Sequence, residues 1–334
     1  MAYNRPMRWT RWGSGAVRRR AVTGLPVVVA LVLVVSLTGA GCEAPKRGSF
    51  TVLSYNVAGL PQEISPVNPD KHIPMISPLL NEYDVVLTQE DFDWWVPALD
   101  GFTFAHYHEQ LRAEVTHPHR SAQWVGPEGA GIDPAVRDAP FVGDGLGFLT
   151  RMPFSDETRR SWPDCHGGLD TSDGGAGDCL SGKGFGVVTM TLTTGRVVDV
   201  YTLHAEAGST ATDQALQEVD FEQLASFVTE HSAGRAVILG GDTNLHIDSE
   251  PADAAVWDEF LDATGFTDVC DELDCDEPGS IDKMAYRNAG GVTLTPTSHS
   301  LPRADFLDEE GVPLSDHPPL VVAFDWRAKP TRAH

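Results

Sequence analysis

Several apolar segments of this 334-residue chain end in a polar residue that can take part in chemistry. The segments are short and rich in β-branched residues, which is typical of buried strands. A side chain at a strand end is held rigidly by the sheet but remains open to a cleft, so such positions often carry function. We therefore expect an α/β fold whose functional residues gather along one rim. The strand-end residues are Asn56, Glu90, His204 and Asp242.

The rest of the pattern predicts one large domain in which strands and helices alternate. Helical periodicity is clearest at residues 213–230, where Leu224 and Val228 can share a face and Gly234 follows the end. Residues 91–142 are expected to be rich in loops. Further strands are expected at 51–57, 84–89, 145–150, 184–192, 197–203, 236–239 and 321–324, with helices at 73–80 and 257–263. The domain is expected to span residues 50–326, between a linker at 43–49 and a mobile tail at 327–334.

The first 42 residues have the composition of an export signal. Six arginines without any acidic residue precede an apolar run at residues 25–37, and small residues then lead to Cys42. A secretory signal peptide has this order, and the run is shorter than the about 20 residues that cross a bilayer. The approach to Cys42 resembles a bacterial lipobox, so we predict a lipidated, exported protein that is either held at the cell surface or secreted. Simple cleavage nearby and an uncleaved N-terminal anchor remain alternatives.

Removal of such a signal would leave a strongly acidic protein. The whole chain has a formal net charge of −24, and six of its 24 basic residues but none of its 48 acidic residues precede Cys42. The part that follows Cys42 therefore carries a formal net charge of −30. Proteins that bind nucleic acid usually present a basic stripe, and the sequence shows none. The charge disfavours DNA or RNA as the main substrate, although a bound cation and a local basic patch could compensate for it.

Four cysteines follow Cys42, and an exported chain can oxidise them. Cys165 and Cys179 flank a loop rich in glycine and aspartate, and Cys270 and Cys275 flank an acidic one. The simplest of three possible pairings joins neighbours, as Cys165–Cys179 and Cys270–Cys275. The alternative is a metal site built from cysteines, for which the spacing is unfavourable.

Five short motifs follow one another along the chain in a recognisable order. On these motifs the chain resembles the endonuclease/exonuclease/phosphatase superfamily, which includes deoxyribonuclease I, abasic-site endonucleases, inositol-polyphosphate phosphatases and neutral sphingomyelinases. A lone Asp-His pair is common by chance, whereas five motifs in order are not. The motifs are Leu53-Ser54-Tyr55-Asn56, Thr88-Gln89-Glu90, Thr202-Leu203-His204, Gly241-Asp242-Thr243-Asn244 and Ser315-Asp316-His317.

The resemblance implies a four-layer sandwich, in which two packed mixed β-sheets are flanked by helices. It also implies a divalent cation that is bound mainly by Glu90, with Asn56 and Asp316 beside it. Hydrolysis of a phosphodiester requires charge neutralisation, and hard cations such as Mg²⁺ take oxygen ligands. Mg²⁺ usually keeps several waters, which suits a ligand set this small. Mn²⁺ and Ca²⁺ are the other candidates.

The resemblance also assigns catalytic roles. His317 becomes the general base for the attacking water, since imidazole titrates near neutral pH, and Asp282 becomes the carboxylate that orients it. Asp242 and Asn244 correspond to the pair that contacts the scissile phosphate and the water. His204 corresponds to a histidine that donates to a phosphate oxygen.

Two further features have a functional and a simpler interpretation. Lys183 precedes a glycine, as in a Lys-Gly pair of sphingomyelinase-like members, and its cation could bind the phosphate; otherwise it is a surface lysine. Four histidines could bind a transition metal, but without regular ligand spacing they are more simply surface residues. They are His106, His108, His117 and His119.

Taken alone, each proposed catalytic residue also has a simpler role. Asn56 can begin a turn, Glu90 can be a solvated acid, and His204 can be a hydrogen-bonded core histidine. The residues around Asp242 are of the types that form turns, and Asp316 can cap a loop. It is the order of the motifs that favours the functional interpretation.

The sequence as a whole predicts an exported, Mg²⁺-dependent phosphoesterase that acts on phosphodiesters. A phospholipid such as sphingomyelin is the expected substrate, cleaved in the manner of a phospholipase C at a membrane to which the N-terminus is anchored. An extracellular nuclease of the deoxyribonuclease I type is the first alternative. A non-catalytic surface binding protein on the same fold is the second. The sequence gives no indication of an oligomeric state.

Overall fold

The centre of the protein consists of two six-stranded mixed sheets. The computed structural model describes residues 46–98, 101–124, 138, 140–169, 172 and 174–329. The first sheet has the order β13 (Val292–Ser300), β14 (Leu320–Ala328), β1 (Arg47–Asn56), β2 (Val85–Gln89), β6 (Gly147–Thr150), β5 (His119–Arg120). The second has the order β11 (Thr267–Asp268), β12 (Asp282–Arg287), β10 (Ala236–Asp242), β9 (Val197–His204), β8 (Gly184–Thr191), β7 (Phe154–Ser161).

The two sheets pack face to face through an apolar layer. Because side chains alternate along a strand, Val52 of β1 faces the other sheet whereas Leu53 faces the outer side. The burial of these side chains removes apolar surface from water and supplies most of the stability of the fold. The inner layer includes Phe50, Val52, Leu87 and Phe148 from the first sheet and Val188, Met190, Val200 and Ile238 from the second.

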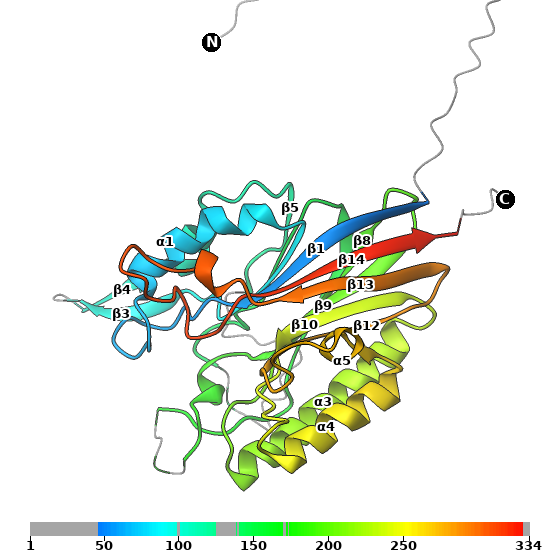
Figure 1. Cartoon of the computed structure of the whole chain (residues 1–334). Helices are drawn as coiled ribbons and strands as arrows, with labels where there is room; N and C mark the ends of the chain where they lie inside the picture. Colours follow the sequence, from blue (N-terminus) through cyan, green and yellow to red (C-terminus); the bar gives the residue numbers. More distant parts are fainter. Residues whose placement is uncertain are drawn as a thin grey trace, which may run out of the picture. The chain divides into compact units, whose positions relative to one another are not determined.

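Helices cover the outer face of each sheet, on opposite sides of the molecule (Figure 1). On the first sheet, Ile73 of α1 packs in one cluster with Leu53, and on the second sheet Leu224 of α3 packs with Leu239. The order of layers is therefore helix, sheet, sheet, helix, which confirms the predicted four-layer sandwich. The helices are α1 (Pro69–Leu79), α2 (Tyr107–Arg112), α3 (Ala211–His231), α4 (Pro251–Thr264) and α5 (Val269–Leu273), with short 3-10 turns at Leu80–Glu82, Asp178–Leu180 and Arg303–Asp305.

The predicted ends of the domain need correction. β1 begins at Arg47, inside the predicted linker, and β14 continues to Ala328, inside the predicted tail. Arg47 is paired with Arg327 at this end of the two strands. Strands pair through their backbones, so the ladder continues past the last strongly apolar residues from which the bounds were predicted. Residues 1–45, which include Cys42, and residues 330–334 lie outside the described residues.

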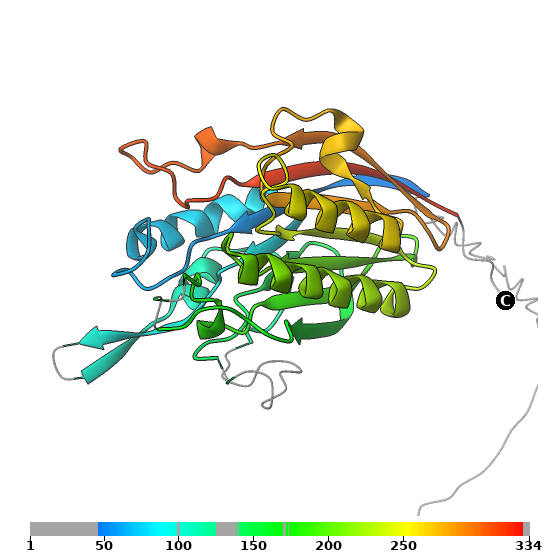
Figure 2. The ribbon, with the colours of Figure 1, turned by 90° about the horizontal axis from the view of Figure 1, so that it is seen from below.

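The predicted loop section, residues 91–142, contains more regular structure than expected. Besides α2 and β5 it holds a hairpin of β3 (Trp94–Ala98) and β4 (Gly101–Ala105), which extends away from the two sheets (Figure 2). Strands β7, β12 and β13 were also absent from the prediction. β7 and β13 lie at sheet edges, where a strand needs few apolar side chains, so their hydrophobic signal is weak.

No helix in the described part of the chain is both long enough and apolar enough to cross a membrane.

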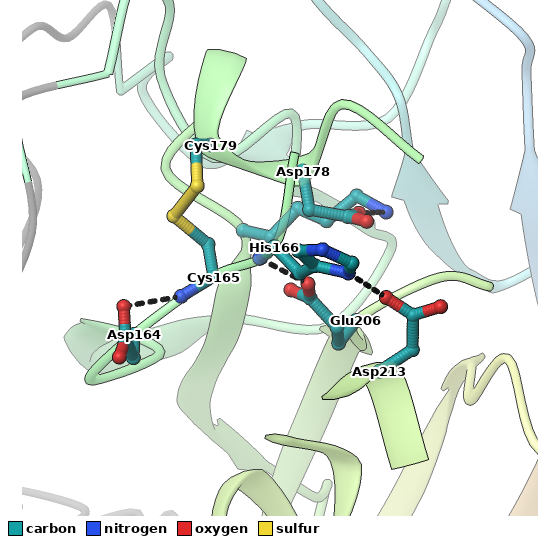
Figure 3. The surroundings of a disulfide bond; sticks show 8 residues. Asp164, Cys165, His166, Asp178, Cys179, Glu206 and Asp213 are labelled. Carbon is teal, nitrogen blue, oxygen red and sulfur yellow. Dashed lines mark hydrogen bonds and ion pairs between the residues drawn. A yellow bond between two sulfur atoms is a disulfide. The ribbon is translucent and has the colours of Figure 1, made fainter. Parts of the chain in front are cut away.

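Both predicted disulfides are confirmed, as Cys165–Cys179 and Cys270–Cys275. The first fixes a loop beside a group of buried carboxylates, those of Asp178, Glu206 and Asp213 (Figure 3). His166, next to Cys165, connects the loop to this group: its backbone N–H donates to Glu206, and its ring Nδ1 lies 2.6 Å from Oδ1 of Asp213.

Glu206 is the most perturbed acid of this group. Its burial is the main cause that raises the pKa of the carboxyl to about 9. The neighbouring carboxylates of Asp178 and Asp213 act in the same direction, whereas the cation of Lys183 and the N–H of His166 oppose them. The folded protein therefore holds this proton more tightly than the unfolded chain, in which an ordinary glutamate has a pKa near 4.5. Between about pH 5 and pH 9, each rise in pH weakens the folded state through this group.

We expect the substitution Glu206→Gln to remove that dependence, because the amide keeps the shape and the acceptor oxygen but does not ionise. The free energy of unfolding, measured by urea denaturation, should increase in the variant relative to the wild type as the pH rises from 5 to 9. Glu218→Gln, at an exposed position of α3, is the control and should show no such trend. If the difference in free energy of unfolding between Glu206→Gln and the wild type stays constant with pH, the raised pKa does not belong to Glu206.

Candidate active site

Strand register brings the predicted residues to one rim of the sandwich. β1 and β2 are parallel, and β9 and β10 are parallel, so the carboxyl ends of each pair lie at the same edge. Asp242 is the register partner of His204 on one side and of Asp282 on the other. Because each of these residues ends or begins a strand, short loops leave their side chains open to the space above the sheets.

The side-chain amide of Asn56 joins the two sheets at this rim. Its Nδ2 donates to Oε1 of Glu90 and to Oδ2 of Asp242, each at 3.0 Å, and Asn56 is completely buried. Its Oδ1 accepts from the backbone N–H of Ala58 at 3.0 Å. In this arrangement Asn56 turns its NH₂ group, not its oxygen, toward the carboxylates. In this geometry Asn56 holds two acids in place, and its role as a metal ligand stays a prediction.

Glu90 lies in a backbone conformation that few residues other than glycine adopt. Its φ is 54°, and such a left-handed residue costs about 1–3 kcal/mol unless its surroundings compensate. Gly59 donates its N–H to the carbonyl oxygen of Glu90 at 3.1 Å. A Cβ at position 59 would lie only 2.3 Å from that oxygen, so glycine is required there. The turn directs the carboxylate of Glu90 into the cavity, where its side chain is 15% exposed.

His317 forms a pair with Asp282, as predicted. Its Nδ1 lies 2.9 Å from Oδ2 of Asp282, and its Nε2 lies 3.6 Å from Oδ2 of Asp242. Ser315 positions the loop that carries this histidine: its hydroxyl donates to the backbone oxygen of Asn56 at 2.7 Å and accepts from the N–H of His317 at 3.2 Å. Ser315 thus links the last motif of the chain to the first.

The charges around His317 hold a proton on its ring. Burial acts against the charged form, but the carboxylates of Asp242 and Asp282 outweigh it and raise the pKa of His317 to about 11. Burial raises the pKa of Asp282 to about 6 despite this partner. For Asp242 burial is outweighed by the rings of His317 and His204, the cation of Lys183 and the hydrogen bond from Asn56, so its pKa lies below the usual value.

His204 lies on the other side of Asp242. Its Nε2 is 3.5 Å from Oδ2 of Asp242 and 3.9 Å from Oε1 of Glu90. Burial, helped by the nearby cation of Lys183, lowers the pKa of His204 well below its ordinary value, so the ring is neutral. A neutral ring can donate one hydrogen bond to a phosphate oxygen, which is the role predicted for it.

Asn244 and Lys183 line the same cavity, which has a volume of about 270 Å³. Asn244 has a φ of 50° and donates from its amide to the backbone oxygen of Ala205 at 3.0 Å. Lys183 is not a surface residue: it is 8% exposed and forms an ion pair with Asp178. Burial disfavours its charge, but Asp178 raises the pKa of Lys183 above its ordinary value, so a cation faces the cavity.

Two sets of candidates do not line this cavity. Asp316 is exposed and lines a neighbouring cavity with Tyr55 and Ser315, not the one that holds Glu90. The four histidines between 106 and 119 contribute to none of the possible metal-binding groups found among the described residues. Two of them have structural partners: His108 lies 3.0 Å from Asp91, and His117 lies 2.8 Å from the backbone oxygen of Tyr83.

Asp178 and Ser315 were not among the predicted site residues. Asp178 pairs with Lys183, and its position in the loop closed by the Cys165–Cys179 disulfide gave no periodic signal. Ser315 could have been found, because it precedes Asp316 and His317 in the last motif.

The residues present suit a hard divalent cation. Oε1 of Glu90 accepts the bond from Asn56, which leaves Oε2 without a hydrogen-bond donor among the described residues. Burial raises the pKa of Glu90 to about 6, which indicates a carboxylate with too little positive charge around it. A carboxylate oxygen that is open to a cavity and short of positive charge is a suitable ligand for Mg²⁺. Asp242, Asp282 and His317 form a second group whose ligand atoms lie close together.

Comparison with known proteins agrees with this geometry. The sphingomyelinases of Mycobacterium tuberculosis and Mycobacterium bovis are each 32% identical to this chain in an alignment of 297 residues that covers 84% of this chain and 54% of theirs. This chain therefore spans about half the length of the curated relatives it matches.

Solved structures share the fold. Sphingomyelinase C from Streptomyces griseocarneus gives a TM-score of 0.53 at 18% identity, over 83% of this chain and 99% of that one. A mutant beta toxin from Staphylococcus aureus with bound magnesium ions gives a TM-score of 0.56 at 15% identity, over 84% of this chain and 100% of that one.

The model of the Endonuclease/Exonuclease/phosphatase family matches residues 53–317, a span that begins in β1 and ends at His317. The matched span contains all of the side chains that meet at the rim. On this match, this chain belongs to the endonuclease/exonuclease/phosphatase family.

Proposed function

We propose that this protein is an exported, divalent-cation-dependent phosphodiesterase that cleaves a phospholipid such as sphingomyelin in the manner of a phospholipase C. The observation that carries the proposal is its 32% identity to the sphingomyelinase of Mycobacterium tuberculosis. The cavity that joins Glu90, Lys183 and His317 supports it, because it contains a cation ligand, a phosphate-binding cation and a base.

His317 supplies the base. Asp282 pairs with its Nδ1 and fixes the ring, so Nε2 is the atom that takes the proton from water. Asp242, 3.6 Å from Nε2, stabilises the imidazolium that forms. A base must first be neutral, and the surrounding acids hold a proton on His317. Added positive charge near Glu90 would repel that proton and lower the pKa of His317 toward neutrality.

Glu90 would hold the cation, and Mg²⁺ is the candidate that the carboxylate and the open cavity favour, with Mn²⁺ or Ca²⁺ as alternatives. When bound, a divalent cation supplies positive charge to the phosphate and to the leaving oxygen. Asp316, which is exposed beside this cavity, is another residue predicted to contribute a ligand.

Lys183, His204 and Asn244 form the phosphate-binding side of the cavity. The buried ammonium of Lys183 contributes a full positive charge, and the neutral ring of His204 contributes a hydrogen bond. These groups suit one phosphate. A nucleic-acid duplex presents many closely spaced phosphates and is bound mainly through many lysines and arginines, which the formal net charge of −24 opposes.

Export and anchoring belong to the same proposal. The arginines, the apolar run and Cys42 follow the order of a bacterial lipoprotein signal. A lipid on Cys42 would hold the enzyme at a membrane.

The proposed activity predicts a substrate order. In the presence of Mg²⁺ we expect kcat/KM to be higher for sphingomyelin or a related phospholipid than for plasmid DNA at physiological salt, with release of phosphocholine. Chelation should abolish turnover and added Mg²⁺ should restore it. The assay compares sphingomyelin, phosphatidylcholine, plasmid DNA and bis-p-nitrophenyl phosphate. DNA cleavage without phosphocholine release would favour the nuclease, and cation binding without any turnover would favour the binding protein.

His317→Ala should lower kcat by about 10²–10⁴-fold, the usual effect of removing a positioned general base. The fold should remain, which circular dichroism can check. His299→Ala is a matched control, since His299 lines a different cavity and should leave kcat unchanged. A loss of less than tenfold in His317→Ala would assign the base to another group.

Cys42→Ser should move the protein from the membrane fraction to the soluble fraction, measured by fractionation of the producing bacteria. Stable anchoring requires more than one acyl chain, which lipoprotein maturation supplies at the cysteine. Mass spectrometry of the wild type should show the lipid. A variant that stays in the membrane with an intact signal would indicate an uncleaved anchor.

A further inference from the structure

A buried ion pair involves the residue that follows Glu90 in the chain. The side chain of the next residue, Asp91, is fully buried and forms an ion pair with Nη1 of Arg112. Its Oδ1 lies 3.0 Å from Nδ1 of His108, and its Oδ2 accepts from the hydroxyl of Thr88 at 3.3 Å. We call these four residues the Asp91 clamp. Arg112 and His108 both belong to α2, so the clamp ties that helix to the end of β2.

The clamp has no room to shift. A Cβ at position 147 would lie 2.3 Å from Oγ1 of Thr88 and 2.6 Å from Nη2 of Arg112, so only glycine leaves space for the cluster. Nε and Nη2 of Arg112 are buried without hydrogen-bond partners among the described residues. Asp91 is therefore the main compensation for the buried charge of Arg112.

The clamp acts on the strained turn at Glu90. Backbone bonds hold the turn on both sides: Gly59 donates to the carbonyl oxygen of Glu90 at 3.1 Å, and the N–H of Asp91 donates to Gly145 at 2.9 Å. A non-glycine residue with a φ of 54° persists only where its surroundings fix it from several directions. The backbone bonds locate the turn, and the buried side chain of Asp91 anchors the residue that follows Glu90.

We propose that Asp91, held by Arg112 and His108, is a positioning residue that keeps the carboxylate of Glu90 directed into the cavity. This inference rests on the proposed function, in which Glu90 holds the cation. Asp91 itself touches neither cation nor substrate. The competing interpretation is that Asp91 and Arg112 form an ordinary buried pair that contributes only to stability.

A matched pair elsewhere in the protein separates these interpretations. The side chain of Asp199 in β9 is also fully buried and is bound by Nε of Arg235 at 2.8 Å, by the hydroxyl of Ser232 at 2.6 Å and by that of Thr189 at 2.9 Å. Asp199 lies five residues before the rim, about 17 Å along the strand. Asp199→Asn therefore reproduces the loss of a buried acid without disturbing Glu90.

The test compares Asp91→Asn with Asp199→Asn in the full chain. Mg²⁺ binding is measured by isothermal titration calorimetry, hydrolysis of bis-p-nitrophenyl phosphate gives kcat and KM, and thermal melting reports the fold. Partners that orient a metal ligand are worth about 10–100-fold in affinity or activity. We expect Asp91→Asn to raise the Kd for Mg²⁺ and lower kcat within that range, and Asp199→Asn to leave both unchanged although it melts at a lower temperature.

A folded Asp91→Asn variant with wild-type Mg²⁺ affinity and kcat would overturn the proposal. If that variant does not fold, the double substitution Asp91→Asn with Arg112→Met replaces it, because it leaves no unpaired buried charge. The same rise in the Kd for Mg²⁺ is expected of it, and wild-type affinity would likewise overturn the proposal.

A crystal structure of the variant gives a readout that does not depend on the proposed activity. We expect Glu90 to leave the left-handed region and to lose its hydrogen bond to Nδ2 of Asn56. If the wild type shows no cation-dependent hydrolysis but Glu90 moves in the variant, the proposed function is wrong and the positioning role of Asp91 is supported. If Glu90 keeps its φ and its bond to Asn56, the clamp is wrong, whatever the wild type hydrolyses.

Discussion

The hydrogen bonds of the Asn56 amide are the contact on which the geometry of the rim depends. Glu90 follows a strand of the first sheet and Asp242 ends a strand of the second, so backbone pairing within either sheet cannot fix the distance between them. One NH₂ group that donates to both carboxylates does so. The orientation of Asn56 is itself fixed at its oxygen by Ala58 and at its backbone by Ser315. The first and last motifs of the chain are thereby joined.

The rim is also defined by an imbalance of charge. Glu90, Asp242 and Asp282 are acids in buried positions, and their nearest positive partners are His317 and Lys183. Burial raises the pKa of Glu90 and of Asp282, while the two aspartates together raise that of His317. Such a site favours whatever brings positive charge, either protons or a cation. A cation bound near Glu90 would therefore favour proton release from His317 through electrostatics alone.

The sequence could predict the residues at the centre of the site but not the residues that hold them in place. Asn56, Glu90, His204 and Asp242 were found because strand ends are visible in the apolar pattern, and parallel pairs place such ends at one edge. Asp91 and Arg112 contribute through packing between β2 and α2, and Asp178 contributes through an ion pair with Lys183 at the end of an irregular loop. No periodic pattern in the sequence records either contact. The same reason explains the edge strands β7 and β13: their stability comes from the backbone of a neighbour, and their own side chains are largely polar.

The pairing of Arg47 with Arg327 marks the end of the sheet that lies opposite the cavity. β1 runs from Arg47 to Asn56, about 30 Å, so the strand starts at the face opposite the rim. A tether on this side would turn the cavity outward from its own attachment surface. If the proposed anchor and the proposed lipid substrate both hold, the lipid that reaches the cavity first would belong to an opposing bilayer.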